Sequence, residues 1–146
     1  MNKYKQLVTD NLIGDCFRTC IATLLQLPPE VLPNDFSPNW STNWDIYLEQ
    51  FGLGLSPNNN RSQPIWLSTP WIASVKSLNY KDGTHAILMH KTSIVLHDPS
   101  TKKQYKTGTD LFGKDVVMSG CHILVTDITK LHVLDEYRKR ITPNNG

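Results

Sequence analysis

The spacing of apolar residues changes about halfway along the chain, and this change constrains the fold more than any other feature. Residues 14–27 and 41–51 carry apolar side chains at helical spacing, which predicts two helices. Further along, short apolar runs lie between turn residues, which predicts strands. Helices followed by strands are typical of an α+β domain, in which N-terminal helices pack on an antiparallel sheet.

The element boundaries follow from residues that start or stop helices and strands. Asp15 is placed to cap the first helix, and Pro28-Pro29 to end it. The expected strands span residues 65–67, 71–75, 85–90, 93–98 and 121–128. A last helix is expected at residues 129–140, with its basic end favoured by the helix dipole. Residues 55–63 are expected to form an exposed loop, and residues 142–146 a frayed tail.

Length and charge exclude several classes of protein. A chain of 146 residues fits a single domain spanning residues 1–146. The net charge of +2 is small, whereas a nucleic-acid binder usually shows a strong basic stripe with interleaved aromatics, so no nucleic-acid partner is expected. No apolar stretch approaches the roughly 18 residues of a spanning helix, and no export signal is visible. We therefore expect a cytoplasmic protein without a membrane partner.

Cys16 is the candidate nucleophile. Three cysteines are an odd number, so free thiols are expected rather than a complete disulfide framework. Cys16 falls in the first turn of the predicted helix, where unpaired amides and the helix dipole favour a thiolate. Cys20 lies one turn further along the same face, and we assign it and Cys121 to packing. The alternative is that Cys16 is also a small core residue.

His85 and Asp98 are the candidate base and its partner. If Lys91-Thr92 forms a two-residue hairpin loop, His90 pairs with Ser93, and counting outward places His85 opposite Asp98. Directly opposed residues share a face of the sheet, so the imidazole would lie beside the carboxylate. A three-residue loop would shift this register by one. A purely structural His–Asp pair at a strand end is the alternative.

A zinc site built from Cys16, Cys20, Cys121 and His122 is a rival interpretation, because Cys/His sites are common. Cys16 and Cys20 lie within one helix, however, and adjacent residues of a strand point to opposite faces. We therefore expect neither a metal nor another cofactor.

Several motifs resemble those of small bacterial and phage-encoded papain-like proteins. The helix opens with Gly14-Asp15-Cys16-Phe17 and continues Cys-Ile-Ala-Thr-Leu-Leu to residue 25, and a Leu-Pro-Pro-Glu-Val-Leu-Pro segment follows at residues 27–33. The later His-Ala-Ile-Leu at residues 85–88 and Val-Leu-His-Asp-Pro at residues 95–99 also match. The nearest enzymes of known role in this group are peptidase domains that process double-glycine leader peptides. The matches cover about a third of the chain.

This resemblance implies a papain-like thiol hydrolase that cleaves or transfers an acyl, peptide or isopeptide bond in a protein or peptide substrate. It implies Cys16 as nucleophile, His85 as base and Asp98 as the residue that orients the base. It also implies a glutamine side chain in the oxyanion hole. Gln6 is the candidate, although its spacing to Cys16 is longer than in the leader peptidases. If the protein is phage-encoded, the host cytoplasm is the expected compartment.

Two questions stay open at the level of sequence. The same triad serves peptidases, isopeptidases, deamidases, amidases and acyltransferases, and neither the substrate nor the oligomeric state follows from the residues. A papain-like module that binds or inhibits a partner without turnover is the second functional hypothesis.

Overall fold

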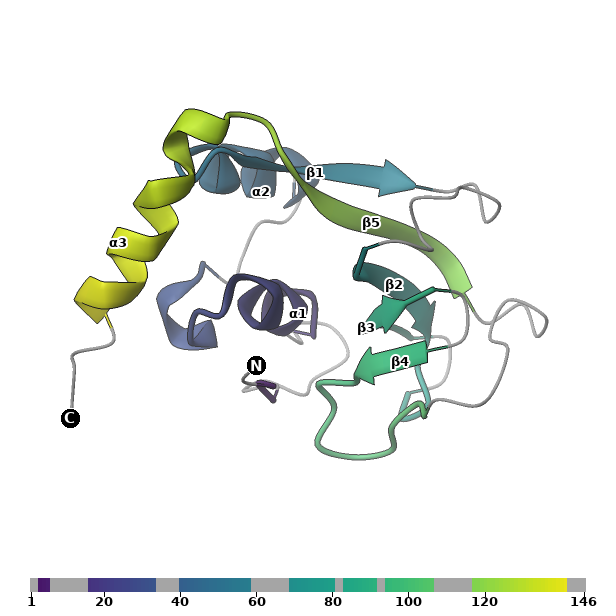
Figure 1. Cartoon of the computed structure of the whole chain (residues 1–146). Helices are drawn as coiled ribbons and strands as arrows, with labels where there is room; N and C mark the ends of the chain where they lie inside the picture. Colours follow the sequence, from purple (N-terminus) through teal and green to yellow (C-terminus); the bar gives the residue numbers. More distant parts are fainter. Residues whose placement is uncertain are drawn as a thin grey trace. The chain divides into compact units, whose positions relative to one another are not determined.

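The computed structural model has an α+β fold, as the sequence predicts (Figure 1). It describes residues 3–5, 16–33, 40–58, 69–80, 83–91, 94–106 and 117–141, without the side chains of residues 40–42, 58 and 117–118. Its elements are α1 (Cys16–Leu25), η1 (Pro29–Val31), α2 (Trp40–Glu49), β1 (Leu53–Asn58), β2 (Trp71–Lys76), β3 (Thr84–His90), β4 (Ile94–His97), β5 (Val117–Val125), η4 (Ile128–Lys130) and α3 (Leu131–Ile141). No helix in these described ranges is long and apolar enough to cross a membrane.

The strands form one five-stranded sheet in the order β1-β5-β2-β3-β4. The prediction of a loop at residues 55–63 is wrong for its first part, because residues 53–58 form β1. Pro57 and Asn58 are residue types that are common in turns, which led to the prediction of a loop. β1 lies at an edge of the sheet, however, where a proline is tolerated. The strand expected at residues 65–67 lies outside the described residues, as do residues 59–63 and 142–146.

The chain divides into two compact units. The first comprises Met1–Asn34 and Pro57–His122, and the second comprises Asp35–Ser56 and Ile123–Gly146. In the first unit, α1 packs against β3, and β2 pairs antiparallel with both β3 and β5.

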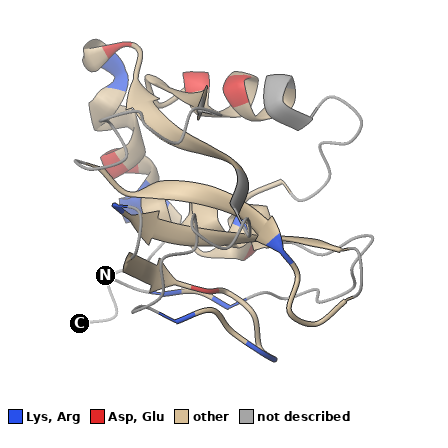
Figure 2. Cartoon of the chain, turned by 90° about the vertical axis from the view of Figure 1, so that its right-hand side faces the viewer, with Lys and Arg blue, Asp and Glu red and all other residues tan. Residues whose placement is uncertain are grey.

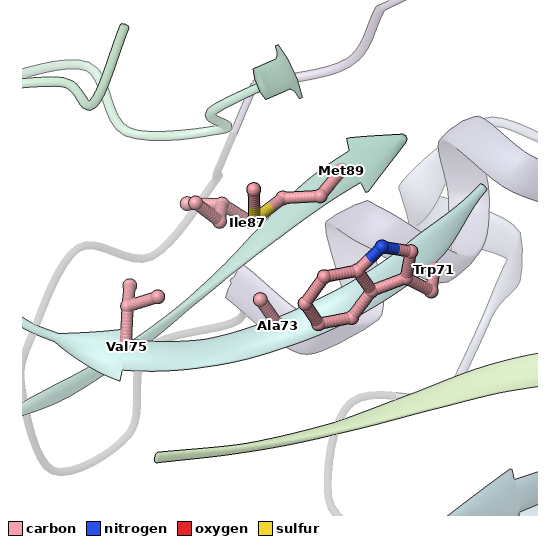
Figure 3. Close-up of a cluster of buried hydrophobic side chains, with 5 residues drawn as sticks. All are labelled: Trp71, Ala73, Val75, Ile87 and Met89. Carbon is pink, nitrogen blue, oxygen red and sulfur yellow. The ribbon is translucent and has the colours of Figure 1, made fainter. Parts of the chain in front are cut away.

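A buried apolar cluster joins β2 to β3 (Figure 3). Its members are Trp71, Ala73, Val75, Ile87 and Met89, all fully buried. The β2–β3 register places Trp71 opposite Met89 and Ala73 opposite Ile87. Opposed residues share a face of the sheet, so these side chains form one continuous apolar surface. Val95 and Tyr105 pack against it.

Helix α1 is buried more completely than its sequence pattern predicts. The pattern indicates one apolar stripe, yet the six residues from Arg18 to Thr23 are all buried. Six residues exceed one helical turn, so the middle of the helix has no solvent-exposed side. Even the charged Arg18 is buried, and its Nη1 donates to the Leu32 carbonyl at 3.4 Å.

Helix α1 ends at Leu25, before the two prolines, and backbone geometry determines this end. Gln26 has a positive φ of 55°. The Leu27 amide donates to the Ala22 carbonyl at 3.0 Å, and the Gln26 amide donates to the Thr23 carbonyl at 3.4 Å. This pair of bonds is a Schellman motif, which satisfies the last helical carbonyls. The prediction that Pro28-Pro29 ends the helix is therefore two residues late.

In the second unit, Gly52 makes a close backbone contact. Its φ is 71°, and its carbonyl accepts hydrogen bonds from the amides of Thr126 at 2.8 Å and Asp127 at 3.2 Å. A Cβ at this position would lie 2.1 Å from the Asp127 carbonyl oxygen. Both the backbone angle and the space require glycine here.

We expect Gly52→Ala to lower the free energy of unfolding by at least about 2 kcal/mol, because it combines left-handed backbone strain with a backbone clash. Chemical denaturation followed by circular dichroism measures this loss. Ile46→Ala on α2 is the control, since Ile46 is 64% exposed and its truncation should change stability by less than about 0.5 kcal/mol. Equal stability of the two variants would contradict the conclusion that position 52 requires glycine.

Candidate active site

His85 and Asp98 form a direct, buried contact. His85 lies at the start of β3, and Asp98 follows the last residue of β4. The His85 Nε2 donates to Asp98 Oδ1 at 2.6 Å, and the two side chains are 10% and 2% exposed. The predicted proximity of imidazole and carboxylate is therefore present in the structure.

The register that brings them together differs from the predicted one. The observed pairs are Leu88–His97, Met89–Val95 and His90–Ile94, with an irregularity after the first. The hairpin connection thus has three residues rather than two, and it opens at Lys91 with a positive φ of 58°. Asp98 does not pair across the ladder with His85 but reaches it from the loop after β4. The residue pair was predicted correctly and the register was wrong.

Backbone amides hold the Asp98 carboxylate in place. Oδ1 accepts from the Ser100 amide at 2.9 Å, and Oδ2 accepts from the Tyr105 amide at 2.8 Å. Burial acts to raise the pKa of Asp98, but the hydrogen bonds from His85 and from these two amides, together with the imidazolium charge, lower it below its ordinary value. Asp98 is therefore an ionised and fixed partner for His85.

Cys16 is the third candidate residue of this site, after His85 and Asp98. It is the first residue of α1, is partly exposed, and has a side chain that interacts with the His85 ring. Burial acts to lower the pKa of His85, but hydrogen bonds with Asp98 and Cys16, and their charges, raise it to about 9. Because Nε2 faces Asp98, Nδ1 is the ring nitrogen that remains for the thiol. The His85 ring thus interacts with both a carboxylate and a thiol.

The other two cysteines are placed as packing residues, as predicted. Cys20 is fully buried and Cys121 is 7% exposed. Burial, followed by the charges of Cys16, Asp98 and Cys121, raises the pKa of Cys20 well above its ordinary value, which keeps this thiol protonated. None of the three cysteines forms a disulfide.

The rival zinc site is not assembled in the part of the chain that the structure describes. Within these ranges, no three His, Cys, Asp or Glu side chains are grouped so that they could hold a metal ion. His122, one of the four proposed ligands, is buried beside Cys121 in β5, and burial lowers its pKa.

The N-terminal segment lies against the loop that carries Asp98. The Tyr4 amide donates to Thr23 Oγ1 at 3.3 Å, and His97 Nε2 donates to the Tyr4 carbonyl. Lys5 Nζ lies 3.5 Å from the carbonyl oxygens of both Asp98 and Ser100. Gln6 and Asp15, the predicted oxyanion donor and helix cap, lie outside the described residues.

The supporting residues of Asp98 were not predicted from the sequence. The bond from the Ser100 amide is an Asx-type turn, a local pattern that the Asp98-Pro99-Ser100 order could have indicated. Two further supports come from later in the loop: the Tyr105 amide, and the Gln104 side chain, which donates to the Ser100 carbonyl at 2.6 Å. No local sequence pattern indicates these two contacts.

The tryptophans are placed mainly as core residues where the structure describes them. Trp44 is 3% exposed, and Trp71 is fully buried with its Nε1 donating to the Lys91 carbonyl at 2.9 Å. The side chains of Trp40 and Trp66 lie outside the described residues.

Comparison with protein-family models, curated proteins and solved structures found no match to this chain. The functional inference therefore rests on the geometry of the site itself.

We expect Asp98→Asn to lower the pKa of His85 by more than one unit from its value of about 9, because the amide removes the charge that favours imidazolium. NMR titration of the His85 ring measures this change. Asp135→Asn is the matched control, since Asp135 pairs with Arg138 on α3 and should leave the His85 titration unchanged. A His85 pKa that is the same in both variants would contradict the conclusion that Asp98 raises the pKa of His85.

The raised pKa of His85 also predicts how stability depends on pH. Its folded value of about 9 exceeds the ordinary value of 6.5, so its stabilising contribution is full below pH 6.5 and is lost as the pH rises through 9. The difference corresponds to roughly 3 kcal/mol. In denaturation measured from pH 6 to 10, wild type should therefore lose its stability advantage over His85→Gln. An advantage that is constant or grows with pH would exclude this linkage.

Proposed function

We propose that this chain is a papain-like thiol hydrolase, which cleaves or transfers an acyl, peptide or isopeptide bond through Cys16, His85 and Asp98. The observation that carries the proposal is the 2.6 Å hydrogen bond from His85 to the buried Asp98 carboxylate, together with the interaction of the Cys16 side chain with the same ring. A nucleophile, a base within hydrogen-bond reach and a third group that orients the base are what covalent catalysis by cysteine requires.

The electrostatics favour a protonated His85 ring. With its pKa raised to about 9, His85 is protonated near neutral pH and can give a proton to a leaving group. Asp98 stabilises the imidazolium and engages Nε2, which leaves Nδ1 as the nitrogen available to the sulfur. A purely structural His–Asp pair does not require the interaction of His85 with a partly exposed cysteine.

The reaction would proceed by acyl transfer. The Cys16 sulfur attacks the carbonyl carbon, and the carbonyl oxygen becomes an oxyanion close to the first amides of α1. As the C–N bond breaks, the His85 imidazolium gives its proton to the leaving amine, which leaves a thioester on Cys16. His85 then removes a proton from water or another acceptor, which attacks the thioester and restores the thiolate.

Labelling with iodoacetamide tests the activation of Cys16. We expect wild type to be alkylated at Cys16 at pH 6, where an ordinary thiol reacts slowly, and His85→Ala to be alkylated about 100-fold more slowly. Peptide mapping by mass spectrometry locates the label, and buried Cys20 serves as an internal negative control. His132→Ala on exposed α3 is the matched control and should react like wild type.

The outcomes separate the hydrolase from a silent binding module. Equal labelling of wild type and His85→Ala, with both folded by circular dichroism, would exclude His85 as the activator and favour the module that binds without turnover. A rate loss in His85→Ala and a smaller one in Asp98→Asn supports the triad. Cys16→Ala should then abolish any hydrolysis of peptide substrates, whereas a pure binder would keep its biological effect.

A further inference from the structure

Five exposed lysines lie on or near the loop that carries Asp98. We call this set the lysine surface: Lys3, Lys5, Lys102, Lys103 and Lys106. Figure 2 shows lysine positions gathered along the loop after β4. The whole chain has 15 Lys and Arg against 13 Asp and Glu, a net charge of only +2. Residues 94–106 carry three of these lysines and one acidic residue, the buried Asp98.

The lysine surface reaches the backbone of Asp98 and the neighbouring Ser100. Lys5 Nζ lies 3.5 Å from the carbonyl oxygens of Asp98 and Ser100, and the charges of Lys3 and Lys5 both act on neighbouring His97. On the other side, the Lys102 amide donates to Ser100 Oγ at 3.0 Å. Asp98 thus lies between the two groups of lysines, and its carboxylate is hydrogen-bonded to His85.

Part of the lysine surface is held in a fixed arrangement. Asn79 ties the loop down: its Nδ2 donates to Ser100 Oγ at 3.3 Å and to the Lys103 carbonyl at 3.1 Å, and its Oδ1 accepts from the Lys103 amide at 3.0 Å. Lys102 Nζ donates to the Tyr80 hydroxyl at 3.2 Å and lies 5.2 Å from the centre of that ring. Fixed cations lose little entropy when an anion binds.

Few carboxylates oppose these charges in the described part of the first unit. Its acidic residues there are Glu30 and Asp98, and Asp98 is buried against His85. The ammonium groups beside the catalytic loop therefore have no neighbouring exposed carboxylate on that loop within residues 94–106. Such a surface raises the local concentration of anions and their rate of association.

We infer that the lysine surface recruits an acidic segment of a protein or peptide substrate to Cys16. This inference rests on the proposed hydrolase function and names the class of substrate that it takes. Acidic side chains next to the scissile bond would pair with the lysines and bring the carbonyl to the thiol.

A peptide suits this surface better than a nucleic acid. The acyl-transfer chemistry of the adjacent site needs a carbonyl carbon, which a peptide supplies. Binding of single-stranded nucleic acid generally needs aromatic rings free to stack with bases. The two tyrosines of this region are already engaged, since Tyr80 lies under Lys102 and Tyr105 packs on the apolar cluster.

Two electrophilic peptides of equal length test the inference, one with three Glu and one with three Gln flanking the reactive group. We expect the Glu peptide to label Cys16 about tenfold faster at low ionic strength. The preference should shrink toward one near 1 M salt, where the screening length is about 3 Å. The readout is the ratio of the two labelling rates measured by mass spectrometry.

Charge reversal locates the effect. The double variant Lys102→Glu/Lys103→Glu should lose the preference for the Glu peptide or invert it. Lys139→Glu/Arg140→Glu is the matched control, because it changes the net charge equally, on exposed residues of α3. It should keep the wild-type ratio. A ratio that falls equally in both double variants would mean a general charge effect and would overturn the inference.

Iodoacetamide labelling separates the two possible failures. If its reaction with Cys16 does not depend on His85, the proposed function fails. If that dependence holds but the two peptides label Cys16 equally, the hydrolase stands and the acidic-substrate inference is wrong. A fluorescent oligonucleotide that binds wild type but not Lys102→Glu/Lys103→Glu, together with equal labelling by the two peptides, would assign the surface to nucleic acid and overturn the inference.

Discussion

The contact between His85 and Asp98 is the interaction on which the site depends. It joins the start of β3 to the loop after β4 through a 2.6 Å hydrogen bond with almost no solvent access. A buried carboxylate is costly unless it is paired and hydrogen-bonded. Here the imidazole and the amides of Ser100 and Tyr105 satisfy both oxygens, so Asp98 stays ionised in a buried position.

That arrangement determines what the neighbouring groups can do. Because Asp98 engages Nε2, Nδ1 is the nitrogen left for other groups, and interactions with Asp98 and Cys16 raise the pKa of the ring to about 9. The two cysteines on α1 have different surroundings although they lie one turn apart. Cys16 is partly exposed at the helix start and interacts with the His85 ring, whereas Cys20 is enclosed and remains a neutral thiol.

The loop from Asp98 to Lys106 has two roles in this structure. Its backbone amides hold the carboxylate from one side, while its lysines face solvent on the other. The Asn79 side chain fixes this loop to the end of β2, so the geometry of the site and the placement of the charges share one support.

The sequence by itself determined the α+β class, the approximate places of α1, α2, β2, β3, β4, β5 and α3, and the identity of the His85–Asp98 pair. These features depend on local periodicity and on the short sequence separation of a hairpin. The tertiary structure alone decided the rest. The register of β3 on β4, the strand β1, and the burial of Arg18 depend on contacts between distant segments, which local patterns do not encode. The approach of Cys16 to His85 also depends on packing across about seventy residues of chain, because no local periodicity relates a helix start to a strand so far away.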